Sequence, residues 1–306
     1  AVVYLHMFRG LLYGSYQKPK ELVWIFGCTI YLAMMAEGFL GYVLPYGQMS
    51  YWGAQVIISL FGAIPYIGES LELWVRGDYY ISGITVSRFF ALHVVALPLV
   101  LIALVFLHLV ALHEVGAGNP EGVDIEKYLD DDGVPLDSVP FFPYKVLNAL
   151  VAIGVFMTVF SIIMFFFPEG GGYFIEMANF QEANPLVTPD HIAPVWYYAP
   201  FYTMLRAIPD PLGGLIVMAS AVAIFFIVPW LDRSKVASIR YKGIYSKIAI
   251  TLFGVSFLTL GYLGTVGVTE IRKTMSVICT VIYFAYFLLM PIYSKYETTK
   301  EVPERL

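Results

Sequence analysis

The stretch FFALHVVALPLVLIALVFLHLVAL, Phe89–Leu112, decides the fold of this chain. It contains no Asp, Glu, Lys or Arg but carries two histidines, His93 and His108. As an α-helix it would extend about 36 Å, enough to cross a hydrocarbon core of about 30 Å. The stretch therefore predicts a transmembrane helix, and ionisable groups inside such a helix are usually functional.

The rest of the chain has the same character. Of the 306 residues, 59% are hydrophobic and 13% charged, whereas about a quarter are charged in a soluble domain. We predict an all-α integral membrane protein, a transmembrane helix bundle of six full spans plus the end of a seventh, Ala1–Tyr16. Because Ala1–Tyr16 starts apolar without an initiator Met or a charged leader, we expect the sequence to be truncated at its N-terminus. The other five spans are Leu22–Leu44, Val146–Phe167, Leu212–Leu231, Ile248–Val268 and Met275–Tyr293.

Charge predicts the topology. If Ala1–Tyr16 ends in the cytoplasm, thirteen of the 18 Lys and Arg residues fall on that side and five on the other, as the positive-inside rule requires. The connections Gly47–Ser87 and Glu169–Pro211 are rich in Trp, Tyr, Gly and Pro, so we expect short surface helices there that roof a cavity on the outer side. The net charge of −5 argues against nucleic acid as a partner. The two cysteines, Cys28 and Cys279, lie in apolar spans and are interpreted as small core residues.

The histidines suggest a cofactor. His93 and His108 are fifteen residues apart, about 22 Å and four helical turns, with an excess rotation of about 60° that Pro98 can relax. His6 lies near the cytoplasmic end of its own span, at the depth of His108. Paired neutral imidazoles from facing helices suit a six-coordinate haem iron, although each histidine taken alone is equally well a satisfied buried group or part of a proton path. Arg9, one turn after His6, is placed to pair with a haem propionate or simply to reach the interface.

Several motifs carry a resemblance: YLHMFRGLLYGSY at Tyr4–Tyr16, GYVLPYGQMS at Gly41–Ser50, RFFALH at Arg88–His93, PVWY at Pro194–Tyr197 and LRAIP at Leu205–Pro209. In combination they resemble cytochrome b, the di-haem quinone-handling subunit of the cytochrome bc complex (ubiquinol–cytochrome c reductase), in its bacterial form. The family fold has eight helices, of which the first and most of the second would precede this sequence. The resemblance implies a haem-binding part at 1–113 with surface helices at 47–87, a cytoplasmic loop at 114–142, and a C-terminal part at 143–306 with a quinol-site loop at 169–211.

The resemblance also assigns roles to residues. His6 and His108 would be axial ligands of the high-potential b-type haem, with Arg9 and Ser15 near its propionates. His93 would bind the low-potential b-type haem, and its partner would lie outside this sequence. His113 would serve quinone at the cytoplasmic side. The quinol-oxidation pocket would include Phe39, Tyr42, Gly53, Ile57, Pro194, Val195, Tyr197 and Tyr202, whereas His191 would be structural.

The implied activity is oxidation of quinol at the outer side, electron transfer through two haems and reduction of quinone inside, coupled to proton translocation. The implied partners are a Rieske iron–sulfur protein, cytochrome c1, ubiquinone or another quinone, and a second copy in a homodimer, in the inner membrane of a bacterium. The alternatives from the sequence are a cofactor-free transporter with a histidine proton relay and a simpler di-haem anchor of a dehydrogenase.

Two departures from the family pattern stand out. Val195 occupies the position where the family usually has a glutamate that accepts a quinol proton, and Glu37 is one candidate substitute. The acidic residue expected at the quinone-reduction site is not matched, with Lys145 or Asn148 near that place.

Overall fold

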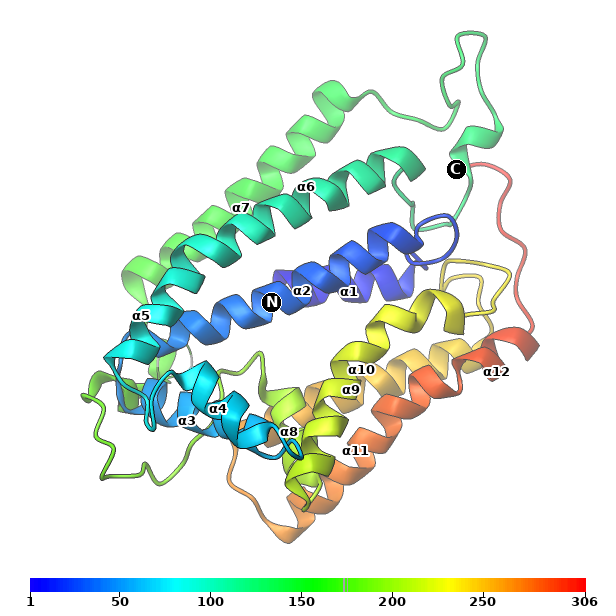
Figure 1. The fold of residues 1–306 in the computed structure, drawn as a ribbon. Helices are drawn as coiled ribbons and strands as arrows, with labels where there is room; N and C mark the ends of the chain where they lie inside the picture. Colours follow the sequence, from blue (N-terminus) through cyan, green and yellow to red (C-terminus); the bar gives the residue numbers. More distant parts are fainter. Residues whose placement is uncertain (173, 175) are drawn as a thin grey trace.

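The computed structural model describes residues 1–172, 174 and 176–306, so two positions of the predicted loop 169–211 lie outside the described residues. The described residues form helices and connections, with no β-strand beyond two isolated bridges. Within the described part of the chain, six helices are long and apolar enough to cross a membrane, and the chain is a multi-pass membrane protein (Figure 1). These helices are α2 (Glu21–Val43), the continuous helix Gly83–Val115, Phe141–Phe166 including α7 (Val146–Phe166), α9 (Pro211–Leu231), α10 (Ile244–Thr265) and α11 (Glu270–Leu288).

The predicted spans are confirmed, with one boundary corrected. The predicted span Met275–Tyr293 covers two helices, because α11 ends at Leu288 and α12 (Met290–Tyr296) begins with Pro291 in its first turn. Proline lacks the amide that would continue the preceding helix but suits the first turn of a new one. The short helix α1 (Val2–Leu12) corresponds to the predicted end of a seventh span.

The helix Gly83–Val115 is not uniform. It consists of α5 (Gly83–Ala91), a π-turn at Leu92–Ala96 and α6 (Leu97–Val115), in which Pro98 lies in the first turn. A π-turn holds more residues than an α-turn and so rotates the chain less per residue. The turn therefore absorbs the excess rotation between His93 and His108 and brings both histidines toward one face.

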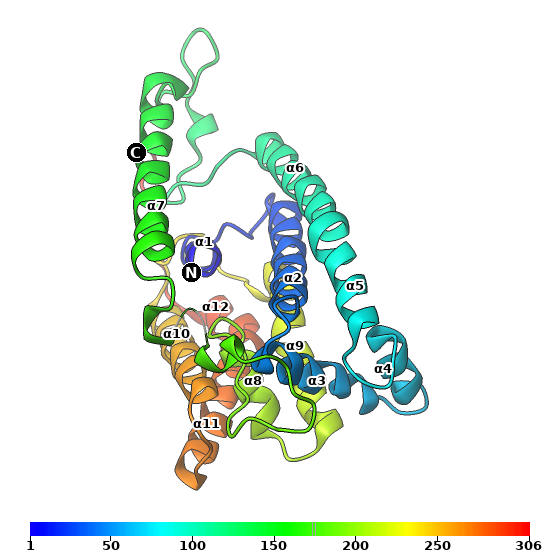
Figure 2. The same ribbon diagram turned by 90° about the vertical axis from the view of Figure 1, so that its left-hand side faces the viewer.

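The two connections expected on the outer side, 47–87 and 169–211, form one roof. They contain α3 (Gln48–Gly62), α4 (Gly68–Arg76) and α8 (Ala199–Ala207), which gather at one end of the bundle (Figure 2). Gln48 ties them together, because its amide nitrogen donates to the Val187 carbonyl (3.0 Å) and its amide oxygen accepts from the Asn184 backbone (2.8 Å). Helices α3 and α4 lie within 47–87, and α8 lies within 169–211.

At the opposite end, a buried carboxylate joins the two halves of the chain. The side chain of Asp232, just after α9, is fully buried and pairs with Lys242 at 2.5 Å. It also accepts hydrogen bonds from the Tyr16 hydroxyl (2.7 Å) and the Gln17 amide (3.0 Å), which lie in the turn between α1 and α2. Burial raises the pKa of Asp232, but the charge and hydrogen bonds of Lys242 and Tyr16 hold this pKa below its usual value overall.

We predict that Lys242→Ala lowers the free energy of unfolding by about 3 kcal/mol, because it leaves the Asp232 charge buried without its cation. The stabilisation is present at neutral pH and is lost as the pH falls through the lowered pKa of Asp232. Unfolding in mixed detergent micelles measures the effect. Lys235→Ala, at an exposed position of the same loop, is the matched control. Equal stability of the two variants would contradict the role given to this pair.

Candidate functional site

Two histidines from different helices face each other. The ring centres of His6 on α1 and His108 on α6 are 6.4 Å apart, with the planes inclined by 74°. An imidazole nitrogen binds a transition metal at about 2 Å and lies about 1 Å from its ring centre, so two axial imidazoles on one ion have centres about 6 Å apart. The observed separation therefore fits two ligands of a single metal ion.

The space around this pair suits an anionic, largely apolar group. His6 and His108 line a cavity of about 290 Å³, together with Arg9, Ser15 and Lys20. Burial lowers the pKa of Lys20, partly offset by Asp124 and Glu126, and an added anion would favour its charged form further. The structure thus brings together the predicted residues His6, Arg9, Ser15 and His108. The remaining cavity wall is mostly apolar and includes Val23, Trp24, Gly27, Cys28 and Ile30.

Two glycines of α2 face the two histidines of the long helix. A Cβ on Gly27 would lie 3.4 Å from His108 Cε1, whereas a Cβ on Gly41 would lie 2.9 Å from both nitrogens of His93 and overlap the ring. The glycines are fourteen residues apart, close to four α-turns, so they share one face of α2. Glycine at 41 is needed for the observed position of His93.

His93 is oriented by α2. Its Nδ1 donates to the Glu37 carbonyl (2.9 Å), and a Glu37 carboxylate oxygen lies 3.0 Å from the same nitrogen. Donation from Nδ1 leaves the lone pair of Nε2 available for a metal. Glu37, one candidate for a substitute quinol base, lies against His93 and does not line the cavity that contains Phe39.

These histidines do not form an ordinary metal site. Across the described residues, no three His, Cys, Asp or Glu side chains cluster in a way that could hold a metal ion. A haem needs only two protein ligands, because the macrocycle supplies the others. The pair His6 and His108 therefore fits haem better than a bare cation.

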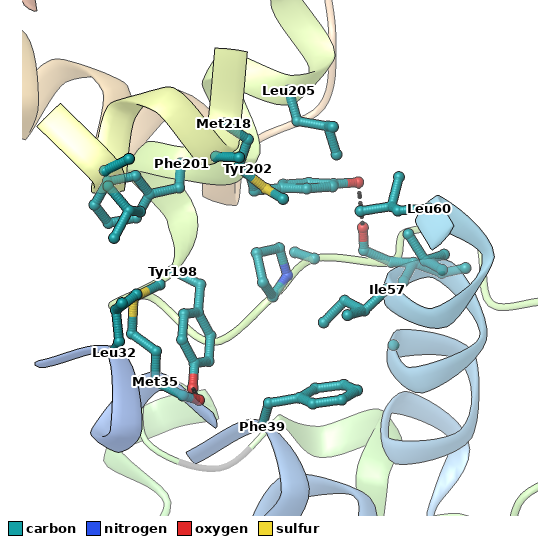
Figure 3. A pocket seen from close by; sticks show the side chains of 18 of the residues that line it. Leu32, Met35, Phe39, Ile57, Leu60, Tyr198, Phe201, Tyr202, Leu205 and Met218 are labelled. Atoms are coloured by element: carbon teal, nitrogen blue, oxygen red, sulfur yellow. Dashed lines mark hydrogen bonds between the residues drawn. The ribbon is translucent and has the colours of Figure 1, made fainter. Parts of the chain in front are cut away.

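A second cavity, of about 580 Å³, lies between α2, α3, α8 and α9. Five of the eight residues predicted for the quinol pocket line it, and Figure 3 labels Phe39, Ile57 and Tyr202 among its side chains. These five are Phe39, Gly53, Ile57, Pro194 and Tyr202.

The other three predicted residues are not among those that line this cavity. Tyr197 lines a separate cavity that also contains Tyr4. The Tyr42 carbonyl accepts a hydrogen bond from Ser50, and the Val195 carbonyl accepts one from the Tyr198 amide (2.9 Å). Tyr198 lines the cavity and was missed, since a tyrosine pair in a connection does not reveal which ring faces inward.

The remaining predicted residues lie at the surface. His113 is exposed near the end of α6, where its Nδ1 donates to the Leu109 carbonyl (2.7 Å). It does not line the cavity between His6 and His108. His191 is also exposed.

Comparisons with known proteins decide the family. The family model described as Cytochrome b(N-terminal)/b6/petB matches residues 1–200, and the model Cytochrome b(C-terminal)/b6/petD matches residues 182–284. The chain belongs to the cytochrome b family. Members of this family normally bind haem b, and the function is electron transfer in a membrane-bound bc-type complex.

Similar proteins cover nearly the whole chain. Cytochrome b of Allochromatium vinosum is 55% identical, over 100% of this chain and 75% of the relative. Cytochrome b of Rickettsia bellii is 47% identical, over 100% of this chain and 74% of the relative. A solved structure titled "Hyperthermophilic respiratory Complex III" has a TM-score of 0.88 at 35% identity, over 97% of this chain and 75% of that chain. The chain is thus a cytochrome b of the bacterial bc type.

We predict that Gly41→Ala displaces the His93 ring and removes or weakens b-haem absorption, because the added Cβ would overlap that ring. The visible spectrum of the purified protein measures the haem content. The matched control is Gly154→Ala on α7, where a Cβ would meet nothing within 4 Å. A full haem content in Gly41→Ala would show that this contact is not required.

Proposed function

We propose that the chain is the di-haem cytochrome b of a quinol–cytochrome c oxidoreductase, which oxidises quinol at the outer side and reduces quinone at the cytoplasmic side. The single observation that carries the proposal is the facing pair His6 and His108 in a cavity with basic side chains. The apolar cavity beneath the outer roof gives independent support.

His6 and His108 would hold the high-potential haem, and His93 would hold the low-potential haem through Nε2. Arg9, Lys20 and Ser15 would bind the propionates, since two cations and a hydroxyl line the same cavity. When bound, the haems supply one-electron carriers at two depths of the membrane. The residues of this chain fix the orientation of each imidazole, as the Glu37 carbonyl does for His93.

The cavity lined by Phe39, Gly53, Ile57, Pro194 and Tyr202 would bind quinol. Its apolar wall excludes water from the ring, which is the usual character of a small-molecule site. Three of the predicted residues would pack outside this wall and would not contact the quinol ring: Tyr42, Val195 and Tyr197. Valine at position 195 cannot accept a proton from quinol.

His113 would serve quinone at the other end of α6. Because its Nδ1 is fixed on the Leu109 carbonyl, its Nε2 is the nitrogen left to take up and deliver a proton. Quinol oxidation outside and quinone reduction inside would together translocate protons. The chain would work with a Rieske protein, cytochrome c1 and ubiquinone or another quinone, as a homodimer in a bacterial inner membrane.

We expect His108→Leu to abolish one b-haem signal and leave the other partly assembled, because leucine cannot bind iron. Redox-titrated visible spectra measure the two haems separately. His191→Leu, at an exposed histidine outside both cavities, should retain both signals. Two intact haems in His108→Leu would refute the ligand assignment and favour a transporter with a histidine relay.

His113→Ala should keep both haem spectra but slow reoxidation of the cytoplasmic-side haem by quinone about tenfold or more, because a positioned acid is lost. Stopped-flow absorbance after chemical reduction of the haems, on addition of quinone with the outer site inhibited, measures this rate. Asp131→Asn in the solvated loop is the control. An unchanged rate in His113→Ala would leave the histidine a structural role only.

A further inference from the structure

We propose that a small cavity between α8, α10 and α11 binds the phosphate group of an anionic phospholipid. The cavity is lined in part by Arg206 on α8 and by Arg272 and Lys273 in α11. It shares no lining residue with the His6–His108 cavity or with the cavity proposed for quinol. The inference goes beyond the proposed electron transfer and does not depend on it.

Cations are scarce at this end of the protein. Only five Lys and Arg residues fall on the side expected outside, and three of the five line this one cavity. The other two are engaged elsewhere, because Arg76 pairs with Glu72 and Arg88 donates to the Trp74 carbonyl (2.9 Å). The three cations therefore form a local cluster of positive charge on a side that carries few cations.

No carboxylate neutralises this cluster. Within the part of the chain that the structure describes, none of Arg206, Arg272 and Lys273 forms an ion pair. Glu270 begins α11 without pairing with a cation, and the Asp210 carboxylate caps the N-terminus of α9. Cations near the N-terminus of a helix such as α11 also oppose the helix dipole. An anion in the cavity would offset both unfavourable effects.

The Arg206 side chain is fixed and still has donors to spare. Its Cζ lies 4.5 Å from the centre of the Tyr202 ring, and its Nη2 donates to the Leu263 carbonyl (2.8 Å). Its Nε is buried and has no hydrogen-bond partner among the described residues. A buried donor without a partner is costly, and guanidinium donors suit phosphate oxygens. The side chain is thus held in place for an oxyanion before any ligand binds.

The size and surroundings of the cavity favour a lipid as the source of the phosphate. Its volume of about 20 Å³ holds only one or two water-sized atoms, such as the oxygens of a head group. Beside it, α11 presents three apolar side chains at helical spacing that are between 43% and 76% exposed: Ile271, Met275 and Ile278. Acyl chains can cover these side chains while the phosphate meets the cations, so one phospholipid satisfies both features.

Lys273→Gln tests the proposal, because it removes one cation whose side chain forms no ion pair among the described residues. The purified complex, depleted of lipid in detergent, is titrated with dioleoylphosphatidylglycerol. Hydrogen exchange of the segment 266–276 reports lipid at this cavity rather than elsewhere. We expect the lipid concentration for half-maximal protection to rise about fivefold, as for loss of one cation beside anionic lipid. Arg88→Gln, exposed on the same expected side and outside this cavity, is the matched control and should behave as wild type.

Two further ligands separate the possible sources of the phosphate. Dioleoylphosphatidylcholine, whose phosphate is balanced by choline, should protect the segment more weakly, and millimolar inorganic phosphate should not protect it. Protection by inorganic phosphate as strong as by the lipid would overturn the lipid assignment in favour of free phosphate.

The site itself is rejected if phosphatidylglycerol does not protect the wild-type segment, or if it protects wild type and Lys273→Gln at equal concentrations. Loss of a subunit from the Lys273→Gln complex would instead assign the cations to an acidic protein partner. Haem absorption checks that the variant assembles, and Arg272→Gln decides by the same measurement if Lys273→Gln does not.

Discussion

The close approach of α2 to the long helix Gly83–Val115 is the constraint on which the rest of the structure depends. Gly27 and Gly41 have no side chains at the two points where His108 and His93 meet α2. Small residues at such contacts let membrane helices approach without strain. The two glycines are fourteen residues apart on α2, whereas the two histidines that meet them are fifteen residues apart on the long helix. The π-turn at Leu92–Ala96 compensates for this difference, because it rotates the chain less per residue. An α-helix throughout would turn one imidazole away from α2.

Hydrogen bonds and an ion pair at the two ends of the bundle hold distant segments of the chain together. Gln48 joins the outer connections, and Asp232 joins the turn after α1 to the loop after α9. The hydrogen bonds that Asp232 accepts hold the segment that carries Arg9 and Ser15 beside the His6–His108 cavity. The two cavities differ in chemistry as a result of their walls: one has basic side chains, and the other has only two phenols among apolar groups.

The sequence predicts the helices well, because uncharged runs of about 20 residues have few other stable structures in a membrane. It also predicts that His6 and Arg9 lie near His108, since they are one turn apart on the same helix, whereas Ser15 in the following turn was expected only from the resemblance and Lys20 was not predicted. It predicts a local relaxation of the helix near Pro98 but not its form, a π-turn at Leu92–Ala96, and it does not predict the end of α11 within a continuous apolar run. In the connection that carries Tyr197 and Tyr198, the direction of each aromatic ring depends on contacts such as that with Gly38, so the sequence does not show that Tyr198 lines the cavity between α2, α3, α8 and α9.

The central claim is that this arrangement carries electrons from quinol to protein-bound haem. Its most direct test is the visible difference spectrum of the purified complex before and after addition of quinol, without any other reductant. The account predicts b-type haem absorption that appears on quinol addition, in an amount approaching two haems per chain. A complex that binds no haem, or whose haem quinol does not reduce, would contradict it.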